Sequence, residues 1–146
     1  MQNDSIERRE EEIVEAFAFF DDWMGRYEYL IEQGKQLPPI EERFKTEEYK
    51  IHGCQSQVWV QADERNGHLF YTADSDALIT KGLIALLVYV LNGQKPEDIA
   101  HAKLAFLEKI GLQEHLSPTR KNGLAGMIKK MKLYALLHEN GATEGN

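Results

Sequence analysis

One apolar segment, residues 79–91, constrains the fold of this chain more than any other feature. Its large apolar side chains recur at helical spacing and form an unusually broad stripe; they are Ile79, Leu83, Leu86, Leu87, Val90 and Leu91. A helix with such a broad apolar surface must be surrounded by the rest of the protein. The unbroken run Leu83 to Leu91 is far shorter than the ~20 residues that cross a bilayer. We therefore predict a central buried helix and no membrane partner.

The limits of this helix follow from the residues on either side. Asp74-Ser75-Asp76 supplies side-chain oxygens that can cap a helix N-terminus. The helix is expected to run through about Asn92 and to end at Gly93.

Two helices are expected before it. Ser5 can cap the first, whose apolar positions are Ile13, Phe17 and Phe20. Asp21 and Asp22 interrupt that pattern and can cap the second, for which Gly34 provides a C-terminal stop. The apolar positions of the second helix are Trp23, Tyr27, Leu30 and Ile31.

The middle of the chain has the pattern of a small antiparallel sheet. Residues 57–64 alternate in polarity, and Asn66-Gly67 is typical of a two-residue hairpin turn that leads to a returning strand over 68–73. Residues 49–52 are a further short strand, which gives a sheet of about three strands.

A last helix begins at Ser117-Pro118, which pairs a capping residue with proline at the first helical position. Helices therefore precede and follow the strands, and this order predicts an α+β fold with a segregated sheet. The length of 146 residues fits a single domain that comprises residues 1–146.

Composition narrows the classes of function. The formal net charge of −7 argues against nucleic-acid binding, which needs a dense basic surface. One cysteine cannot form an internal disulfide, so a reducing cytoplasm is the expected location. The charged N-terminus lacks the apolar core of a signal peptide.

That cysteine, Cys54, follows Gly53 and precedes the polar residues 55–57, so it is expected in a connection between strands. The simplest interpretation is that Cys54 only packs in the core as a small hydrophobic residue. A metal site would need more soft ligands than one cysteine and scattered histidines, and a cysteine hydrolase would need a base that no local motif supplies. A shuttle that carries one sulfur atom needs a single thiolate and no second cysteine. These alternatives remain open on the residues alone.

Four sequence blocks resemble the SufE (and CsdE) family of sulfur acceptors. They are YLIEQG with LP (29–34, 37–38), GCQSQVW (53–59), DSDA with KGLIA (74–77, 81–85), and HLSPTR with NGL (115–120, 122–124). The resemblance implies an antiparallel sheet packed with helices, similar to the iron–sulfur scaffold family IscU but without its multi-cysteine metal site. It also implies that a PLP-dependent cysteine desulfurase of the SufS or CsdA type donates sulfur to Cys54 and is stimulated by its removal. An iron–sulfur scaffold complex would then accept the sulfur, and the chain itself would need no cofactor.

The site residues follow in part from the resemblance. Cys54 is the expected nucleophile and persulfide carrier, and an ordinary pKa of ~8.5 would leave only a few per cent as thiolate. Arg120 is the expected cation, because a guanidinium stays charged.

Asp76 matches a family acid near the cysteine, and its alternative role is the helix cap. Gln55, Ser56 and Gln57 can donate hydrogen bonds to the sulfur or satisfy the loop backbone. Gly53 permits the turn.

We also predict that Cys54 is buried at rest, because a persulfide is easily lost to other thiols. The competing hypothesis is an adaptor that regulates the desulfurase or the scaffold by binding alone, with Cys54 incidental.

Overall fold

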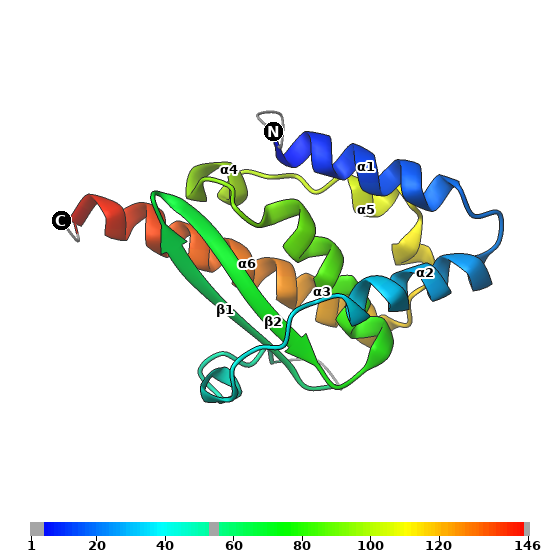
Figure 1. Ribbon diagram of the computed structural model, residues 1–146, viewed down its shortest axis with the longest axis horizontal. Coiled ribbons are helices and arrows are strands. Elements are labelled where there is room, and N and C mark those ends of the chain that lie inside the picture. The colour runs from blue at the N-terminus through cyan, green and yellow to red at the C-terminus, as the bar shows by residue number, and fades with distance from the viewer. Residues whose placement is uncertain (1–4, 53–55, 145–146) are drawn as a thin grey trace.

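The apolar segment forms α3 (Leu78–Leu91), which lies at the centre of the computed structural model (Figure 1). The structure describes residues 5–52 and 56–144. Almost all of α3 is buried, which confirms the prediction of a central helix. The predicted start was too early, because Asp74 and Ser75 continue the preceding strand and Ala77 occupies the N-cap without a side-chain hydrogen bond.

Two N-terminal helices, α1 (Ile6–Ala18) and α2 (Trp23–Lys35), pack beside α3 (Figure 1). Both predicted caps are confirmed. The side chain of Ser5 accepts a hydrogen bond from the Arg8 N–H at 3.1 Å, and that of Asp22 accepts one from the Gly25 N–H at 2.9 Å.

The sequence predicted that Gly34 ends α2. This prediction is wrong, because Gly34 lies inside the helix. A Cβ atom on Gly34 would lie 2.8 Å from the backbone nitrogen of Gly82 in α3, and one on Gly82 would overlap the carbonyl oxygen of Leu30. The two glycines therefore allow α2 and α3 to cross with their backbones in contact. The helix reaches Lys35 because this packing outweighs the low helix propensity of glycine.

The sheet is an antiparallel hairpin of β1 (Val58–Arg65) and β2 (His68–Ser75), with Val58 paired to Ser75 and Arg65 to His68. Asn66 and Gly67 have φ angles of 54° and 80°, as the predicted turn requires.

The prediction of about three strands is wrong, because residues 49–52 contribute only an isolated bridge from Lys50 to Trp59. Ile51 N–H donates to the Val58 carbonyl at 2.8 Å, and Val60 N–H donates to the Tyr49 carbonyl at 2.9 Å. Tyr49 N–H also closes a turn onto Thr46, so the extended pairing cannot continue.

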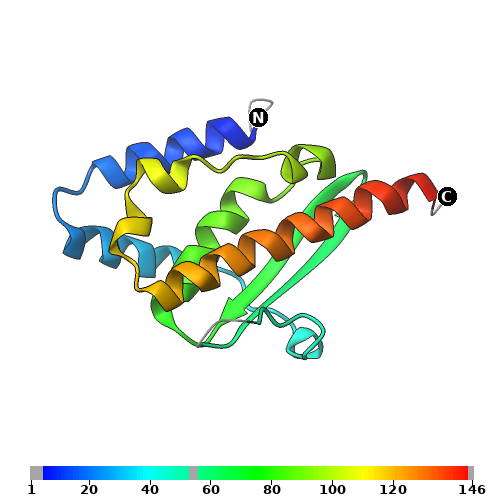
Figure 2. The same cartoon turned by 180° about the vertical axis from the view of Figure 1, so that it is seen from behind.

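The long helix α6 (Pro118–Glu144) lies along the hairpin, as Figure 2 shows. Tyr71 O–H donates to the Met131 carbonyl at 2.7 Å, and Tyr134 O–H donates to the Val60 carbonyl at 3.0 Å. Burial raises the pKa of Tyr134 to about 12, with smaller contributions from Tyr49 and Glu48, and burial also raises the pKa of Tyr71. These phenols join α6 to the sheet.

Short helical segments complete the chain. They are η1 (Glu42–Phe44), α4 (Pro96–Ala100), α5 (Phe106–Lys109) and η2 (Leu112–His115). Within the described residues, no helix combines the length and the apolar character needed to cross a membrane.

Candidate functional site

The candidate site is built around the connection between Ile51 and Val58. The hydrogen bond between these two residues brings the ends of the connection together. Residues 53–55 lie outside the described residues, so the roles expected for Gly53, Cys54 and Gln55 stay predictions from the sequence. The described residues on both sides define the surroundings.

Asp76 holds the C-terminal side of this connection. Its carboxylate accepts a hydrogen bond from Gln57 N–H at 2.9 Å, and its own N–H donates to the Gln57 carbonyl at 3.2 Å. The alternative role of Asp76 as the cap of α3 is therefore wrong. Because β2 extends through Ser75, the Asp76 carboxylate lies opposite Gln57 and not at the first turn of the helix.

Ser56 is half-buried and lies against the first part of α3. Its hydroxyl is 3.4 Å from the hydroxyl of Thr80, which is buried. This separation is longer than that of an ordinary hydrogen bond between hydroxyls, so the Ser56 hydroxyl can turn toward another acceptor at little cost.

A cavity of about 110 Å³ lies beside Ser56. Its lining comes from the loop, from α3 and from the start of α6, and consists of Ser56, Ala77, Thr80, Thr119, Arg120, Gly123 and Met127. The starts of α3 and α6 lie near each other at the same end of the hairpin in both views (Figures 1 and 2). The structure thus brings together Ser56 and Arg120, which are far apart in the sequence.

Arg120 lies in the first turn of α6 and is exposed. Its backbone N–H donates to the Ser117 hydroxyl at 3.2 Å, which confirms Ser117 as the helix cap. Its guanidinium makes no ion pair or hydrogen bond with the part of the chain that the structure describes. The guanidinium is therefore available to an anion at the cavity. An anion there would also offset the unfavourable interaction of a positive charge with a helix N-terminus.

The N-terminal side of the connection is set by α6. A Cβ atom on Gly126 would lie 3.2 Å from a side-chain carbon of Ile51 and 3.6 Å from the carbonyl oxygen of His52. Four residues of this site were not predicted as such from the sequence: Thr80, Gly123, Gly126 and Met127. Glycines three residues apart inside a helix indicate a close approach of another segment, and this signal could have found the α6 wall.

Asp74 lies at the same end of the hairpin and pairs with two cations. The ammonium of Lys81 is 3.3 Å from its carboxylate, and that of Lys45 is 3.5 Å away. Desolvation opposes the charge on Lys45, but Glu42 and Asp74 together raise the pKa of Lys45. These pairs fix the end of β2, and with it the position of Asp76.

No group of three or more His, Cys, Asp or Glu side chains placed to hold a metal ion occurs among residues 5–52 and 56–144. The described groups are instead hydroxyls, an amide N–H held by a carboxylate, and one guanidinium. Such a set can bind and orient a small anion or a polarisable sulfur.

Comparison with known proteins shows the family to which this chain belongs. The family model SufE, described as the Fe-S metabolism associated domain, matches residues 11–135. The chain therefore belongs to the SufE family, which is associated with iron–sulfur metabolism, and this confirms the resemblance found in the sequence.

Several similar proteins are named as SufE-like. The chain is 39% identical over 145 residues to an uncharacterised SufE-like protein of Synechocystis, with 99% of this chain and 91% of the relative covered. It is 41% identical over 127 residues to an uncharacterised SufE-like protein of Rhizobium meliloti, covering 84% and 91%. It is 46% identical over 129 residues to SufE-like protein 1, chloroplastic/mitochondrial, of Arabidopsis thaliana. That match covers 86% of this chain but only 34% of the plant protein.

A solved structure supports the fold. The solution structure of a hypothetical protein from Thermus thermophilus matches with a TM-score of 0.72 at 24% identity. The match covers 87% of this chain and 93% of that chain.

Proposed function

We propose that this protein, as one SufE-like unit over residues 1–146, accepts sulfur from a PLP-dependent cysteine desulfurase onto Cys54 and passes it to an iron–sulfur scaffold complex. The observation that carries the proposal is the position of the only cysteine. In the sequence it stands between Ile51 and Val58, and the described ends of that connection are held by Ile51, Asp76 and the α6 wall. Ser56, at one of these ends, lines a cavity that Arg120 also lines. Family membership supports the same role.

The sulfur transfer needs no external oxidant. The Cys54 thiolate attacks the terminal sulfur of the partner's persulfide, and a new sulfur–sulfur bond forms as the old one breaks. The partner leaves as a thiolate, and Cys54 carries the transferred sulfur as a persulfide. One thiolate is consumed and one is produced, so the charge and the electrons balance.

The surrounding residues assist this exchange. The guanidinium of Arg120 favours the thiolate form of Cys54, since a nearby cation lowers a thiol pKa. Ser56 and Gln55 donate hydrogen bonds to the sulfur, while Gly53 lets the backbone turn. Asp76 positions the loop through Gln57.

The chain itself uses no cofactor in this scheme, because PLP belongs to the desulfurase. A single reduced thiol suits a reducing compartment such as the cytoplasm. The name of the Arabidopsis relative describes that protein as chloroplastic/mitochondrial.

The experiment compares Cys54→Ser with the unaltered protein in an assay of sulfide release by a purified SufS- or CsdA-type desulfurase. We expect the variant to bind the desulfurase with unchanged affinity and to give no stimulation. Gln113→Ala, an exposed substitution on η2, is the control and should stimulate fully. If Cys54→Ser stimulates as well as the unaltered protein does, the adaptor hypothesis is correct and the sulfur-carrier proposal is not.

A further inference from the structure

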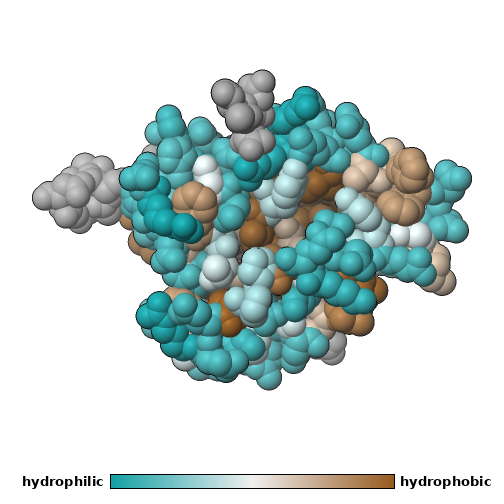
Figure 3. Space-filling view, in the orientation of Figure 1, coloured by the Kyte–Doolittle hydropathy of each residue, from teal (hydrophilic) through white to brown (hydrophobic). Residues whose placement is uncertain are grey.

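A groove of about 580 Å³ lies between α1, α2 and α3. Figure 3 shows it as a hydrophobic floor in the middle of one face, bordered by hydrophilic side chains. Its volume lies in the range typical of ligand sites, roughly 300–1,000 Å³. It lies beside the C-terminal half of α3, whereas Ser56 and the cavity that it lines lie beside Thr80 at the other end.

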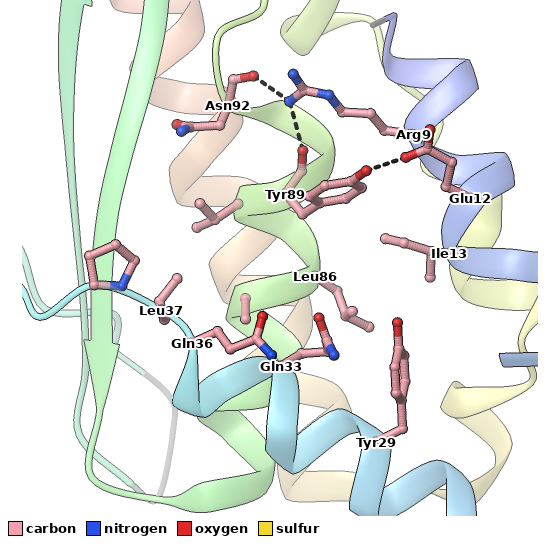
Figure 4. Close-up of a pocket in the computed structure, with 13 residues that line it drawn as sticks. Arg9, Glu12, Ile13, Tyr29, Gln33, Gln36, Leu37, Leu86, Tyr89 and Asn92 are labelled. Carbon is pink, nitrogen blue, oxygen red and sulfur yellow. Dashed lines mark hydrogen bonds between the residues drawn. The ribbon is translucent and has the colours of Figure 1, made fainter. Parts of the chain in front are cut away.

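One wall of this groove carries a row of polar groups without partners. Tyr29 and Gln33 of α2 and Gln36, which directly follows α2, lie along this wall (Figure 4). The Tyr29 hydroxyl and both glutamine side-chain amides make no hydrogen bond with the residues that the structure describes. These side chains can turn toward a ligand without breaking a hydrogen bond within the described part of the protein.

The floor of the groove is apolar, with Ala85, Leu86 and Val88 of α3. The wall that α1 forms is mixed, because Arg9 and Glu12 line it beside Ile13. Arg9 closes one end, because its guanidinium donates to the carbonyl oxygens of Tyr89 and Asn92 at 2.8 and 2.7 Å (Figure 4).

The spacing of the polar row selects the form of the ligand. Residues three and four apart on a helix have their Cβ atoms about 5–6 Å apart. In an extended peptide, groups that face the same side repeat every ~6.7 Å. Each glutamine amide offers one acceptor and donors, which match the N–H and C=O of one peptide residue. A helical ligand could pair this row only through its side chains, because its backbone groups bond to one another.

Charge selects the composition of that peptide. A second hollow adjoins the groove and shares Glu12 and Tyr29 with it, and it includes Glu15. Glu12 is already engaged by Arg8 at 3.6 Å and by the Tyr89 hydroxyl. Glu15 makes no ion pair with the described part of the chain. A basic side chain at this end would be complementary.

We propose that the α1–α2–α3 groove binds an extended peptide segment of another protein, with alternating apolar side chains against Ile13 and Leu86 and a basic residue near Glu15. The peptide backbone pairs with Tyr29, Gln33 and Gln36. This site is independent of sulfur transfer on Cys54.

The test uses a random heptapeptide library displayed on phage and selected on the full-length protein. We expect enriched peptides with alternating apolar residues and at least one Lys or Arg. Binding of a synthetic enriched peptide, measured by fluorescence anisotropy, should weaken about tenfold or more in the triple variant Tyr29→Phe, Gln33→Met, Gln36→Met, as loss of several hydrogen bonds implies. Methylation of alternate peptide nitrogens should weaken binding in the same way.

Two controls keep the outcome decisive. The triple variant should unfold at the unaltered temperature, since it loses no hydrogen bond among the described residues, and Gln113→Met on η2 should bind the peptide normally. The proposal is wrong if no peptide is enriched, or if enriched peptides bind the triple variant equally well. It is also wrong if sedimentation shows a dimer in which a second copy covers the groove.

Discussion

The two ends of α3 differ in how their polar groups are used. At the N-terminal end, the backbone around the cysteine connection is held by reciprocal hydrogen bonds between Gln57 and Asp76, and one guanidinium, that of Arg120, is left available. At the C-terminal end, the groove has an apolar floor and a row of amides without partners among the described residues. Our two proposals therefore place sulfur transfer near one end of α3 and peptide recognition near the other.

The largest expected effect is a complete separation of the two activities. Cys54→Ser should abolish stimulation of the desulfurase and leave peptide binding unchanged. The triple groove variant should lose peptide binding and keep stimulation, because no group of the cysteine site is altered. Stimulation of the desulfurase and peptide binding by fluorescence anisotropy should be measured on both variants. If either variant lost both properties, the two sites would not be independent.

Gly82→Val should destabilise both regions together. The new side chain would collide with the backbone of Leu30, and we expect the free energy of unfolding to fall by about 3 kcal/mol or more. Urea denaturation measures the change. Leu78→Val is the matched control, because Leu78 is an exposed position of the same helix. Equal stability of the two variants would show that the helices do not cross as closely as described.

Arg120→Ala should slow sulfur transfer to Cys54 about tenfold, the effect of losing one charge-assisted contact of about 1.4 kcal/mol. The rate should also need a higher pH, since less thiolate is present without the cation. Arg120→Lys should recover part of the rate, because it restores the charge but not the planar fork. A pH profile identical to that of the unaltered protein would show that Arg120 does not favour the thiolate of Cys54.

Asp76→Ala should loosen the cysteine connection. Loss of the acceptor for Gln57 N–H should cost about 1–2 kcal/mol of unfolding free energy. If Cys54 is buried at rest, as the sequence analysis predicts, a bulky maleimide should alkylate it slowly in the unaltered protein and faster in this variant. Asp21→Ala, an exposed substitution, is the control. Rapid alkylation of the unaltered protein would contradict the prediction of burial.

The smallest effect at neutral pH concerns the scaffold between the two regions. Burial raises the pKa of Tyr134 to about 12 and that of Tyr71 as well, so the folded protein favours the neutral phenols. Their stabilising contribution is complete below the ordinary tyrosine pKa of ~10 and is lost as pH rises through the folded values. Urea denaturation between these limits should show falling stability, with a shallower fall in Tyr134→Phe. A flat profile would contradict the burial of both hydroxyls.

Sequence reasoning succeeded where the deciding contacts are local. The caps at Ser5, Asp22 and Ser117 each involve an N–H three residues away, and the Asn66-Gly67 turn needs only its own backbone angles. The breadth of the apolar stripe was enough to place α3 in the centre.

It failed where contacts between distant segments decide the outcome. Asp76 pairs with Gln57, 19 positions away, only because the register of the hairpin places them side by side. Gly34 looked like a helix stop because its partner, Gly82, could not be known. The groove depends on three helices at once, so no single motif predicts it.

The most direct test of sulfur transfer is a mass measurement of the protein after incubation with a desulfurase, PLP and free cysteine. We predict one added sulfur atom on the peptide that contains Cys54, and none in Cys54→Ser. Full stimulation of the desulfurase with no sulfur on that peptide would contradict the central claim.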